Sequence, residues 1–204
     1  MKRILGFVGI LILGWMGSGY CGTVTVYNTD GSITTTTTTI QAGVNACPVG
    51  GTVSVSAGTY TEAVYINKRI ALVGAGSSST TITAAGLGAT NTVTFSGTAT
   101  DNASISGFKI TGATGNWPAG TGNGIYCHQG SPTITNNTIS GNSYAGIYCL
   151  YSSSPTITNN TISGNRNYGI KCDSSSPSIT NNTISGNTLS GIFCYFSSPT
   201  ITNN

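Results

Sequence analysis

The sequence predicts an all-β fold: a right-handed, single-stranded parallel β-helix, a solenoid with coils of 22–23 residues and a short N-terminal cap helix. The main observation is the phrase SPTITNNTISGN, which stands at residues 131–142 and again at 154–165. A near copy follows at 176–187, and a partial copy begins at residue 198. Self-similarity at this period is typical of solenoids, in which each repeat forms one structural unit.

The composition of the repeat indicates strands rather than helices. Short runs of Thr and Ile alternate with Asn, Gly, Ser and Pro, and strong helix formers are almost absent. The Leu framework of leucine-rich repeats and the hexapeptide rhythm of left-handed β-helices are both missing. A right-handed β-helix with one coil per repeat is the architecture that remains, with a coil perimeter of roughly 70 Å.

The motif GIYC and its variants GIKC and GIFC place Ile and Cys two residues apart, so both are expected to point inward. The cysteines follow each other at steps of 22, 23 and 22 residues: Cys127, Cys149, Cys172 and Cys194. We expect them to form a column of free thiols that act as small core hydrophobes. Asn137, Asn160 and Asn182 stand two residues before an inward Ile, which predicts a ladder of stacked amides.

The sequence divides into three parts. Residues 1–19 combine Lys2 and Arg3 with a short apolar run, which is the pattern of a signal peptide. Residues 20–50 are expected to form an N-terminal strand and the cap helix, which covers the open end of the solenoid. Residues 51–204 are expected to form the β-helix, with a loop insertion at 113–123 and with its C-terminal coils truncated.

The charge balance narrows the class of partner. Charged residues make up 5% of the chain, and without the signal peptide basic and acidic residues nearly cancel. Because there is no basic stripe, nucleic acid is not expected as a partner. The apolar run at 4–16 is too short to span a bilayer. We therefore expect a secreted, periplasmic or cell-surface protein with no stable membrane span after signal cleavage, and a lipid anchor at Cys21 is a second interpretation.

Residues 40–76, IQAGVNACPVGGTVSVSAGTYTEAVYINKRIALVGAG, resemble the entry segment of the pectin-lyase-like superfamily of right-handed β-helices. The C-terminal coils are similar to the parallel β-helix repeats of NosD-type proteins, and the two stretches cover about two-thirds of the chain. The resemblance implies the fold and a role linked to carbohydrate, because the superfamily includes pectate lyases, polygalacturonases, phage tailspikes and adhesins. It is a poor guide to activity.

No catalytic residue, metal site or cofactor is predicted. Enzymes of this superfamily use carboxylates on adjacent coils, but the four acidic residues of this chain are far apart in the repeat. Asp173 shares an outward column with His128, and Leu150 between them implies a separation of about 9.6 Å. The copper that the NosD-type resemblance suggests has little ligand support, because His128 is the only histidine and both methionines lie in the signal segment.

Aromatic residues are the preferred candidates for a ligand-binding site. Tyr126 and Tyr148 are expected in one outward column, with other rings beside them and Trp117 on the inserted loop. Rings on a nearly uncharged surface suit stacking against sugar faces, and the alternative is ordinary packing at turns. The predicted set, which binds a polysaccharide or cell-surface glycan, is Trp117, Tyr126, Tyr144, Tyr148, Tyr151 and Tyr168.

The sequence thus predicts an exported β-helix scaffold that binds carbohydrate without catalysis in these coils. An alternative is the N-terminal part of a polysaccharide lyase or glycoside hydrolase, with its catalytic carboxylates in missing coils. A third interpretation comes from the TIT segments, which place Thr133 and Thr135 outward and repeat them on later coils. Ice-binding solenoids use comparable hydroxyl grids, here with spacings of roughly 4.8 Å and 6.7 Å.

Overall fold

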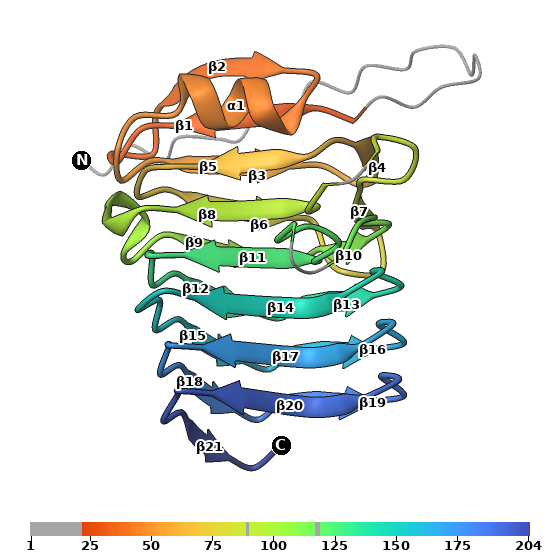
Figure 1. The fold of residues 1–204 in the computed structure, drawn as a ribbon. Coiled ribbons are helices and arrows are strands. Elements are labelled where there is room, and N and C mark those ends of the chain that lie inside the picture. Colours follow the sequence, from red (N-terminus) through yellow and green to blue (C-terminus); the bar gives the residue numbers. More distant parts are fainter. Residues whose placement is uncertain (1–21, 89, 117–118) are drawn as a thin grey trace.

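The computed structural model describes residues 22–88, 90–116 and 119–204. The chain winds as a right-handed β-helix, and its coils stack from the N-terminal cap to the last strand (Figure 1). Parallel pairing joins equivalent strands of neighbouring coils into three sheets, which we call sheets A, B and C. The predicted fold class is confirmed, whereas the predicted signal peptide and Cys21 lie outside the described residues.

Within the described residues, sheet A has nine strands, which in spatial order are β2 (Ile33–Thr37), β1 (Val24–Tyr27), β3 (Thr52–Val55), β6 (Ala71–Gly74), β9 (Ser104–Ser106), β12 (Thr133–Thr135), β15 (Thr156–Thr158), β18 (Ser178–Thr180) and β21 (Thr200–Thr202). The strands of sheet B are β19 (Thr183–Ser185), β16 (Thr161–Ser163), β13 (Thr138–Ser140), β10 (Lys109–Thr111), β7 (Thr80–Thr83) and β4 (Gly58–Thr61). Those of sheet C are β20 (Ser190–Tyr195), β17 (Tyr168–Asp173), β14 (Ala145–Leu150), β11 (Ile125–His128), β8 (Val93–Ser96) and β5 (Val64–Ile66).

The N-terminal end of the stack is covered by antiparallel strands and a helix. β1 pairs antiparallel with both β2 and β3, which ends the run of parallel strands. Helix α1 (Ile40–Ala46) buries Ile40 and Val44, and the Glu62 carboxylate accepts hydrogen bonds from the N–H groups of Ile40 and Gln41. The first donors of the helix are therefore satisfied from a neighbouring coil. A cap helix forms where the sequence predicts one.

The interior of the solenoid consists of apolar columns. In the coil that contains β12, β13 and β14, the four predicted inward side chains are fully buried: Ile134, Ile139, Ile147 and Cys149. Strand pairing places Cys127, Cys149, Cys172 and Cys194 in one column, and all four are free thiols as predicted. Hydrogen bonding to Cys149 and burial raise the pKa of the Cys172 thiol, which keeps it protonated. Each coil buries few large side chains, so stability must come from the stack.

A ladder of asparagine side chains runs along the turn between sheets A and B, as predicted. The Asn137 amide donates to Asn160 Oδ1 at 3.3 Å, and the Asn160 amide donates to Asn182 Oδ1 at 3.0 Å. Each of these oxygens also accepts from the backbone N–H of the preceding asparagine in the ladder, at 3.0 Å. The Asn160 amide further donates to Ile134 O on the preceding coil. One asparagine thus joins three successive coils.

A second asparagine ladder, which the sequence analysis did not predict, lies at the turn between sheets B and C. Asn142 donates to Asn165 Oδ1 at 2.9 Å, and Asn165 donates to Asn187 Oδ1 at 2.9 Å. The glycine that opens each GIYC-type motif makes room for this ladder. A Cβ atom on Gly146 would lie 2.8 Å from Asn165 Nδ2, closer than a carbon atom can approach without displacement. The asparagine of one repeat phrase and the glycine of the motif that precedes this phrase therefore depend on each other.

Removing one member of the first ladder tests how far stability depends on it. Asn160→Ala removes the acceptor for Asn137 N and a donor to Ile134 O, both of which are buried. Each unsatisfied group costs about 1–3 kcal/mol, so the free energy of unfolding in urea should fall by roughly 2–4 kcal/mol. Asn159→Gly is the control, because Asn159 is exposed and has a φ of +55°. Equal unfolding curves for the two variants would contradict the role of the ladder.

Candidate functional site

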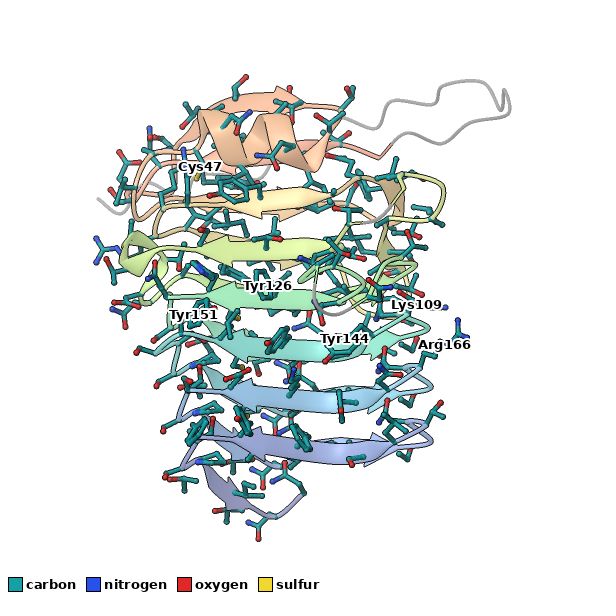
Figure 2. The ribbon with its side chains drawn as sticks, in the orientation of Figure 1. Cys47, Lys109, Tyr126, Tyr144, Tyr151 and Arg166 are labelled. Atoms are coloured by element: carbon teal, nitrogen blue, oxygen red, sulfur yellow. The ribbon has the colours of Figure 1, made fainter. Side chains whose placement is uncertain are left out.

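The outer face of sheet C carries a cluster of aromatic side chains. Strand pairing confirms the predicted outward column of Tyr126, Tyr148, Lys171 and Phe193. Figure 2 shows Tyr126, Tyr144 and Tyr151 on this same face of the stack. The sequence prediction therefore locates the aromatic face correctly, and the burial of each ring decides which of them a ligand can reach.

Two of the rings predicted to stack on sugars are buried. Tyr148 is 2% exposed and Tyr144 is 6% exposed, although both lie on the outer side of the sheet. Tyr148 packs against the rings of Tyr126 and Tyr144 at centroid distances of 5.5 and 6.1 Å, and Tyr144 packs against Tyr168 at 5.7 Å. The expectation that Tyr144 and Tyr148 offer open faces to a ligand is wrong, because rings on adjacent coils cover one another. Trp117 lies outside the described residues.

Lys171 is buried in this cluster, with 6% of its surface exposed. Its Nζ donates to the Tyr144 hydroxyl at 2.9 Å and to the Tyr148 hydroxyl at 3.5 Å, and it lies 4.5 Å from the centre of the Tyr148 ring. The negative face of the ring stabilises the ammonium group. Burial lowers the pKa of Lys171, and the nearby Asp173 carboxylate opposes that shift. Nothing in the repeat pattern indicates that this lysine is buried.

Asp173 forms the carboxylate end of the same cluster. The Tyr148 hydroxyl donates to Asp173 Oδ2 at 3.4 Å, and Ser174 Oγ donates to Oδ1 at 3.2 Å. Burial, and secondarily the Asp173 charge, raise the pKa of Tyr148 above its ordinary value of 10. Burial also raises the pKa of Tyr126 to about 12. A chain of polar groups thus leads from the buried ammonium through a tyrosine hydroxyl to a half-buried carboxylate.

Tyr151 is the most exposed ring of the predicted set among the described residues. It is 56% exposed and packs edge-on against the His128 ring at a centroid distance of 5.4 Å. Its φ is +52°, in the left-handed region that bulky side chains rarely adopt. The spacing from Cys to Pro is six positions in this coil, from Cys149 to Pro155, and five in the coils on either side. Tyr151 therefore stands in a turn that has one extra residue.

Tyr151 contributes to two surface hollows, which we together call the Tyr151 groove. The larger hollow, about 500 Å³, is lined by Gly97, Thr98, Gln129, Tyr151, Ser152 and Ser174. The smaller hollow, about 310 Å³, is lined by Ala119, Gly120, Tyr126, Tyr148, Leu150, Tyr151 and Asp173. The larger one follows the turns after β8, β11, β14 and β17, which at the spacing of adjacent strands is a length of about 14 Å.

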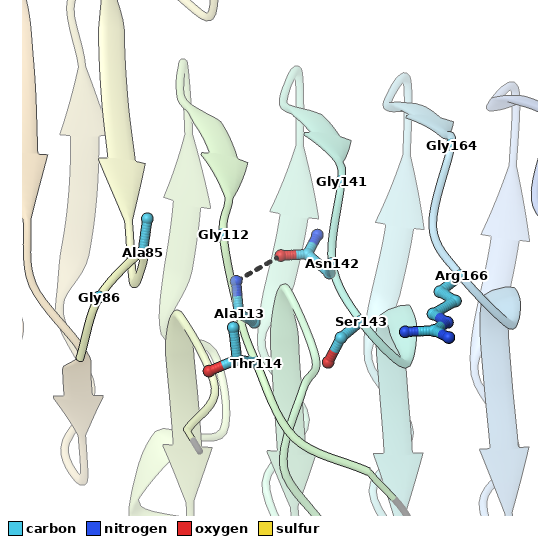
Figure 3. Close-up of a pocket in the computed structure, with 10 residues that line it drawn as sticks. All are labelled: Ala85, Gly86, Gly112, Ala113, Thr114, Gly141, Asn142, Ser143, Gly164 and Arg166. Carbon is cyan, nitrogen blue, oxygen red and sulfur yellow. Dashed lines mark hydrogen bonds between the residues drawn. The ribbon is translucent and has the colours of Figure 1, made fainter. Parts of the chain in front are cut away.

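A third hollow, about 420 Å³, lies at the turn between sheets B and C (Figure 3). Glycines from successive coils form much of its lining, and the Arg166 side chain lies at one end. Two of its polar side chains are already engaged: Asn142 Oδ1 accepts from Ala113 N, and Ser143 Oγ donates to Gly115 O. This hollow follows the second asparagine ladder and presents fewer side chains to a ligand than the Tyr151 groove.

The coils that carry the Tyr151 groove match a known protein family. Residues 77–204, more than half of the chain, match the family model described as a right handed beta helix region. The chain belongs to this family. A search of the curated proteins gave no match. Membership of the right-handed β-helix family accounts for the architecture, and the ligand has to be argued from the side chains of this chain.

The acidic residues of this β-helix protein have separate environments. Three of them bind nearby backbone N–H groups: Glu62 at α1, Asp30 at Ser32 and Asp101 at Ser131. Asp173 and His128 stand two coils apart with Leu150 between them, as predicted. In the described part of the chain, no three His, Cys, Asp or Glu side chains gather into a group that could hold a metal ion. Within the same residues, none of the helices is long and apolar enough to cross a bilayer.

The tyrosine cluster makes the free energy of unfolding depend on pH in the alkaline range. An unfolded tyrosine ionises near pH 10, whereas burial raises the pKa of Tyr126 to about 12 in the folded state. The folded state thus holds the proton of the Tyr126 hydroxyl more tightly than the unfolded state does. The contribution of this group to the free energy of unfolding is therefore complete below pH 10 and is lost as the pH rises towards 12. Urea unfolding should be measured from pH 8 to pH 12. Over this range the free energy of unfolding should fall further for the native sequence than for Tyr126→Phe, by on the order of 1–2 kcal/mol. Parallel curves would contradict the burial of this hydroxyl, and Tyr65→Phe, at an exposed ring, is the control.

Proposed function

We propose that this protein is an exported β-helix scaffold that binds a polysaccharide or cell-surface glycan in the Tyr151 groove, without catalysis in the described coils. The observation that carries the proposal is Tyr151 itself: an exposed ring at a left-handed φ, in the one turn of these repeats that is lengthened by a residue. Left-handed backbone costs roughly 1–2 kcal/mol for a residue other than glycine. The left-handed φ itself belongs to the repeat, since Gln129, Ser174 and Phe196 have it at the same place in their turns. The exposed ring and the extra residue are therefore what set Tyr151 apart.

The groove offers the contacts that a sugar chain requires. The Tyr151 ring supplies a flat apolar face for the C–H side of a sugar ring. Gln129, Ser152 and Ser174 supply amide and hydroxyl groups for hydrogen bonds to sugar hydroxyls. Tyr126 and Leu150 extend the apolar surface into the smaller hollow. A short stretch of a linear polymer lying along the solenoid axis fits the length of about 14 Å.

The N-terminal sequence supports an extracytoplasmic setting for this interaction. Residues 1–19 have the order of a basic segment, an apolar segment and small residues that is typical of signal peptides. The near-neutral charge of the remaining chain favours neither nucleic acid nor an anionic membrane surface as the partner. A secreted, periplasmic or cell-surface location, where polysaccharides are abundant, is the setting that we propose.

Substitution of Tyr151 tests the groove. Tyr151→Ala removes the exposed stacking face, so the affinity for a bound glycan should fall about five- to tenfold. The measurement is binding to an array of immobilised glycans, followed by calorimetric titration with the strongest soluble ligand. Tyr65→Ala is the matched control, because Tyr65 is also an exposed ring on sheet C but lies outside the groove. An equal loss of glycan affinity in both variants, or no loss of affinity in either, would exclude the Tyr151 groove as the binding site.

The alternative function, a polysaccharide lyase or glycoside hydrolase, is tested by measuring cleavage of the glycan. A polysaccharide lyase or hydrolase needs two appropriately spaced ionisable groups at the scissile bond. The bound glycan should be incubated with the protein and assayed for new reducing ends and for unsaturated products. We expect neither, and their appearance would favour the lyase or hydrolase interpretation over a binding scaffold.

Sheet A supports a second candidate function, adsorption to ice. Its outward columns keep strict register: Thr133 pairs with Thr156 and Thr135 with Thr158, and the pattern continues to β21. Hydroxyls and methyls therefore repeat at roughly 4.8 Å along the stack and 6.7 Å along the strand. Sheet B carries a comparable surface, in which Lys109 interrupts the threonine column.

Thermal hysteresis tests this second function. If sheet A adsorbs to ice, the native protein should depress the freezing point below the melting point, and Thr156→Lys should abolish most of the effect by placing a long charged side chain in the column. Thr161→Lys is the matched variant on sheet B and should have a smaller effect, because Lys109 already interrupts that face. Absence of hysteresis in the native protein removes the ice-binding interpretation.

A further inference from the structure

We infer that the Tyr151 groove selects neutral polysaccharides and rejects polyuronates and other polyanionic chains. The inference rests on the proposed function, which it narrows to a class of ligand. It depends on where the charges of the aromatic cluster lie, since aromatic stacking alone does not distinguish a neutral sugar from an acidic one.

The charge that lines the groove is negative. Among the described residues that line the two hollows, Asp173 is the one that carries a carboxylate or an amino group. Its Oδ2 accepts from Tyr148 and its Oδ1 from Ser174, but each carboxylate oxygen has a second lone pair for a ligand hydroxyl. A neutral sugar can donate a charge-assisted hydrogen bond to Asp173. A uronate carboxylate brought to the same place meets a like charge.

The nearest cation is not placed to bind an acidic ligand. Lys171 is 6% exposed, and its Nζ donates to the hydroxyls of Tyr144 and Tyr148 and lies over the Tyr148 ring. Recruiting it for a uronate would require the tyrosine cluster to open. The ammonium group of Lys171 instead stabilises the Asp173 carboxylate through the Tyr148 hydroxyl. The two charges of this pair balance each other, and the carboxylate is the end that lies at the groove.

Among the described residues, the exposed cations do not line the groove. Arg69 stands in the turn after β5, on the same edge of sheet C as Tyr151 but three coils, or about 14 Å, away from it. The other exposed cations are at the opposite edge. Figure 2 shows Lys109 and Arg166 at the edge of this face that is opposite Tyr151. Arg166 lines the third hollow, and Lys109 belongs to sheet B. At physiological salt the Debye length is about 8 Å, so charges at the far edge of a sheet have little influence in the groove.

The expected discrimination can be stated as a fold-change. Two like charges about 4 Å apart repel by on the order of a factor of five in affinity at the dielectric constant of water, and by more where the groove excludes water. A polyuronate carries such a charge on each residue, so it cannot avoid the contact by shifting along the groove. We therefore expect at least about fivefold weaker binding of a polyuronate than of a neutral polymer.

The experiment compares the intact protein with Asp173→Asn on two probe sets: soluble neutral glucans, mannans and xylans, and polygalacturonate and alginate of similar chain length. In gel-retardation or calorimetric titration, the native protein should bind a neutral polymer and bind the polyuronates at least about fivefold more weakly. Asp173→Asn should weaken neutral binding by up to about tenfold, because a charge-assisted hydrogen bond becomes a neutral one, and should increase binding of polyuronate, so that the ratio of the two affinities falls. Raising the salt concentration should narrow the difference in the native protein, because salt screens the repulsion between Asp173 and the uronate carboxylates.

A matched control removes a carboxylate away from the groove. Asp30→Asn changes the net charge by the same amount, and Asp30 bonds to Ser32 near the N-terminal cap. This variant should retain the native preference. A gain of polyuronate binding in both variants would attribute the effect to overall charge and overturn the inference about Asp173.

The outcomes separate this inference from the function on which it rests. Stronger binding of polyuronate than of every neutral polymer, with a loss in Tyr151→Ala, would overturn the selectivity and keep the groove as a glycan site. Binding of no glycan by the native protein would overturn both. Neutral binding that Tyr151→Ala and Asp173→Asn leave untouched would place the site on another face and also overturn both.

Discussion

The amide-to-amide hydrogen bond between asparagines on successive coils is the interaction on which the rest of this structure depends. One coil of 22–23 residues buries too few large side chains to fold by itself. Asn160 shows how the deficit is met, because its side chain bonds to the coil before it and to the coil after it. The spacing of parallel strands, about 4.8 Å, is also the distance at which stacked amides can bond. The two ladders therefore hold the coils from β12 onwards in one register.

Strict register limits where the chain can vary. Residues inside a coil pack against the equivalent residues of the coils above and below, so a change in one core column affects three coils. Turns and outward positions are less constrained. The extra residue between Cys149 and Pro155 is accommodated in a turn, and the strands on either side of it keep their pairing. The ring of Tyr151 stands in that turn. The candidate site is thus located where the ladders permit an irregularity.

The repeat period was sufficient to predict the fold, the inward columns and the first ladder, because each follows from residues that recur at one spacing. The burial of Tyr148 and Lys171 could not be predicted in the same way, since it depends on which rings lie beside them on adjacent coils and on how those rings turn. The second ladder had a signal in the sequence, the SGN that recurs with the repeat and the glycine before each inward Ile. Tyr151 was in the predicted set for its aromaticity, and the spacing of six rather than five from Cys149 to Pro155 is the signal that sets it apart.

The three faces of the solenoid differ in the kind of ligand they can recognise. Sheets A and B repeat hydroxyl side chains from coil to coil, so a ligand that used them fully would need the same period as the stack, as an ice surface has. The outward residues of sheet C differ between coils: Tyr126 and Tyr148 are followed by Lys171 in one column, and the next column runs from His128 to Leu150 to Asp173. A surface without internal repetition can define a single site and a single orientation for a finite ligand. A specific glycan site is therefore expected on sheet C, because its outward residues depart from the repeat. The stack tolerates this irregularity because sheets A and B and the two asparagine ladders keep the regular repeat.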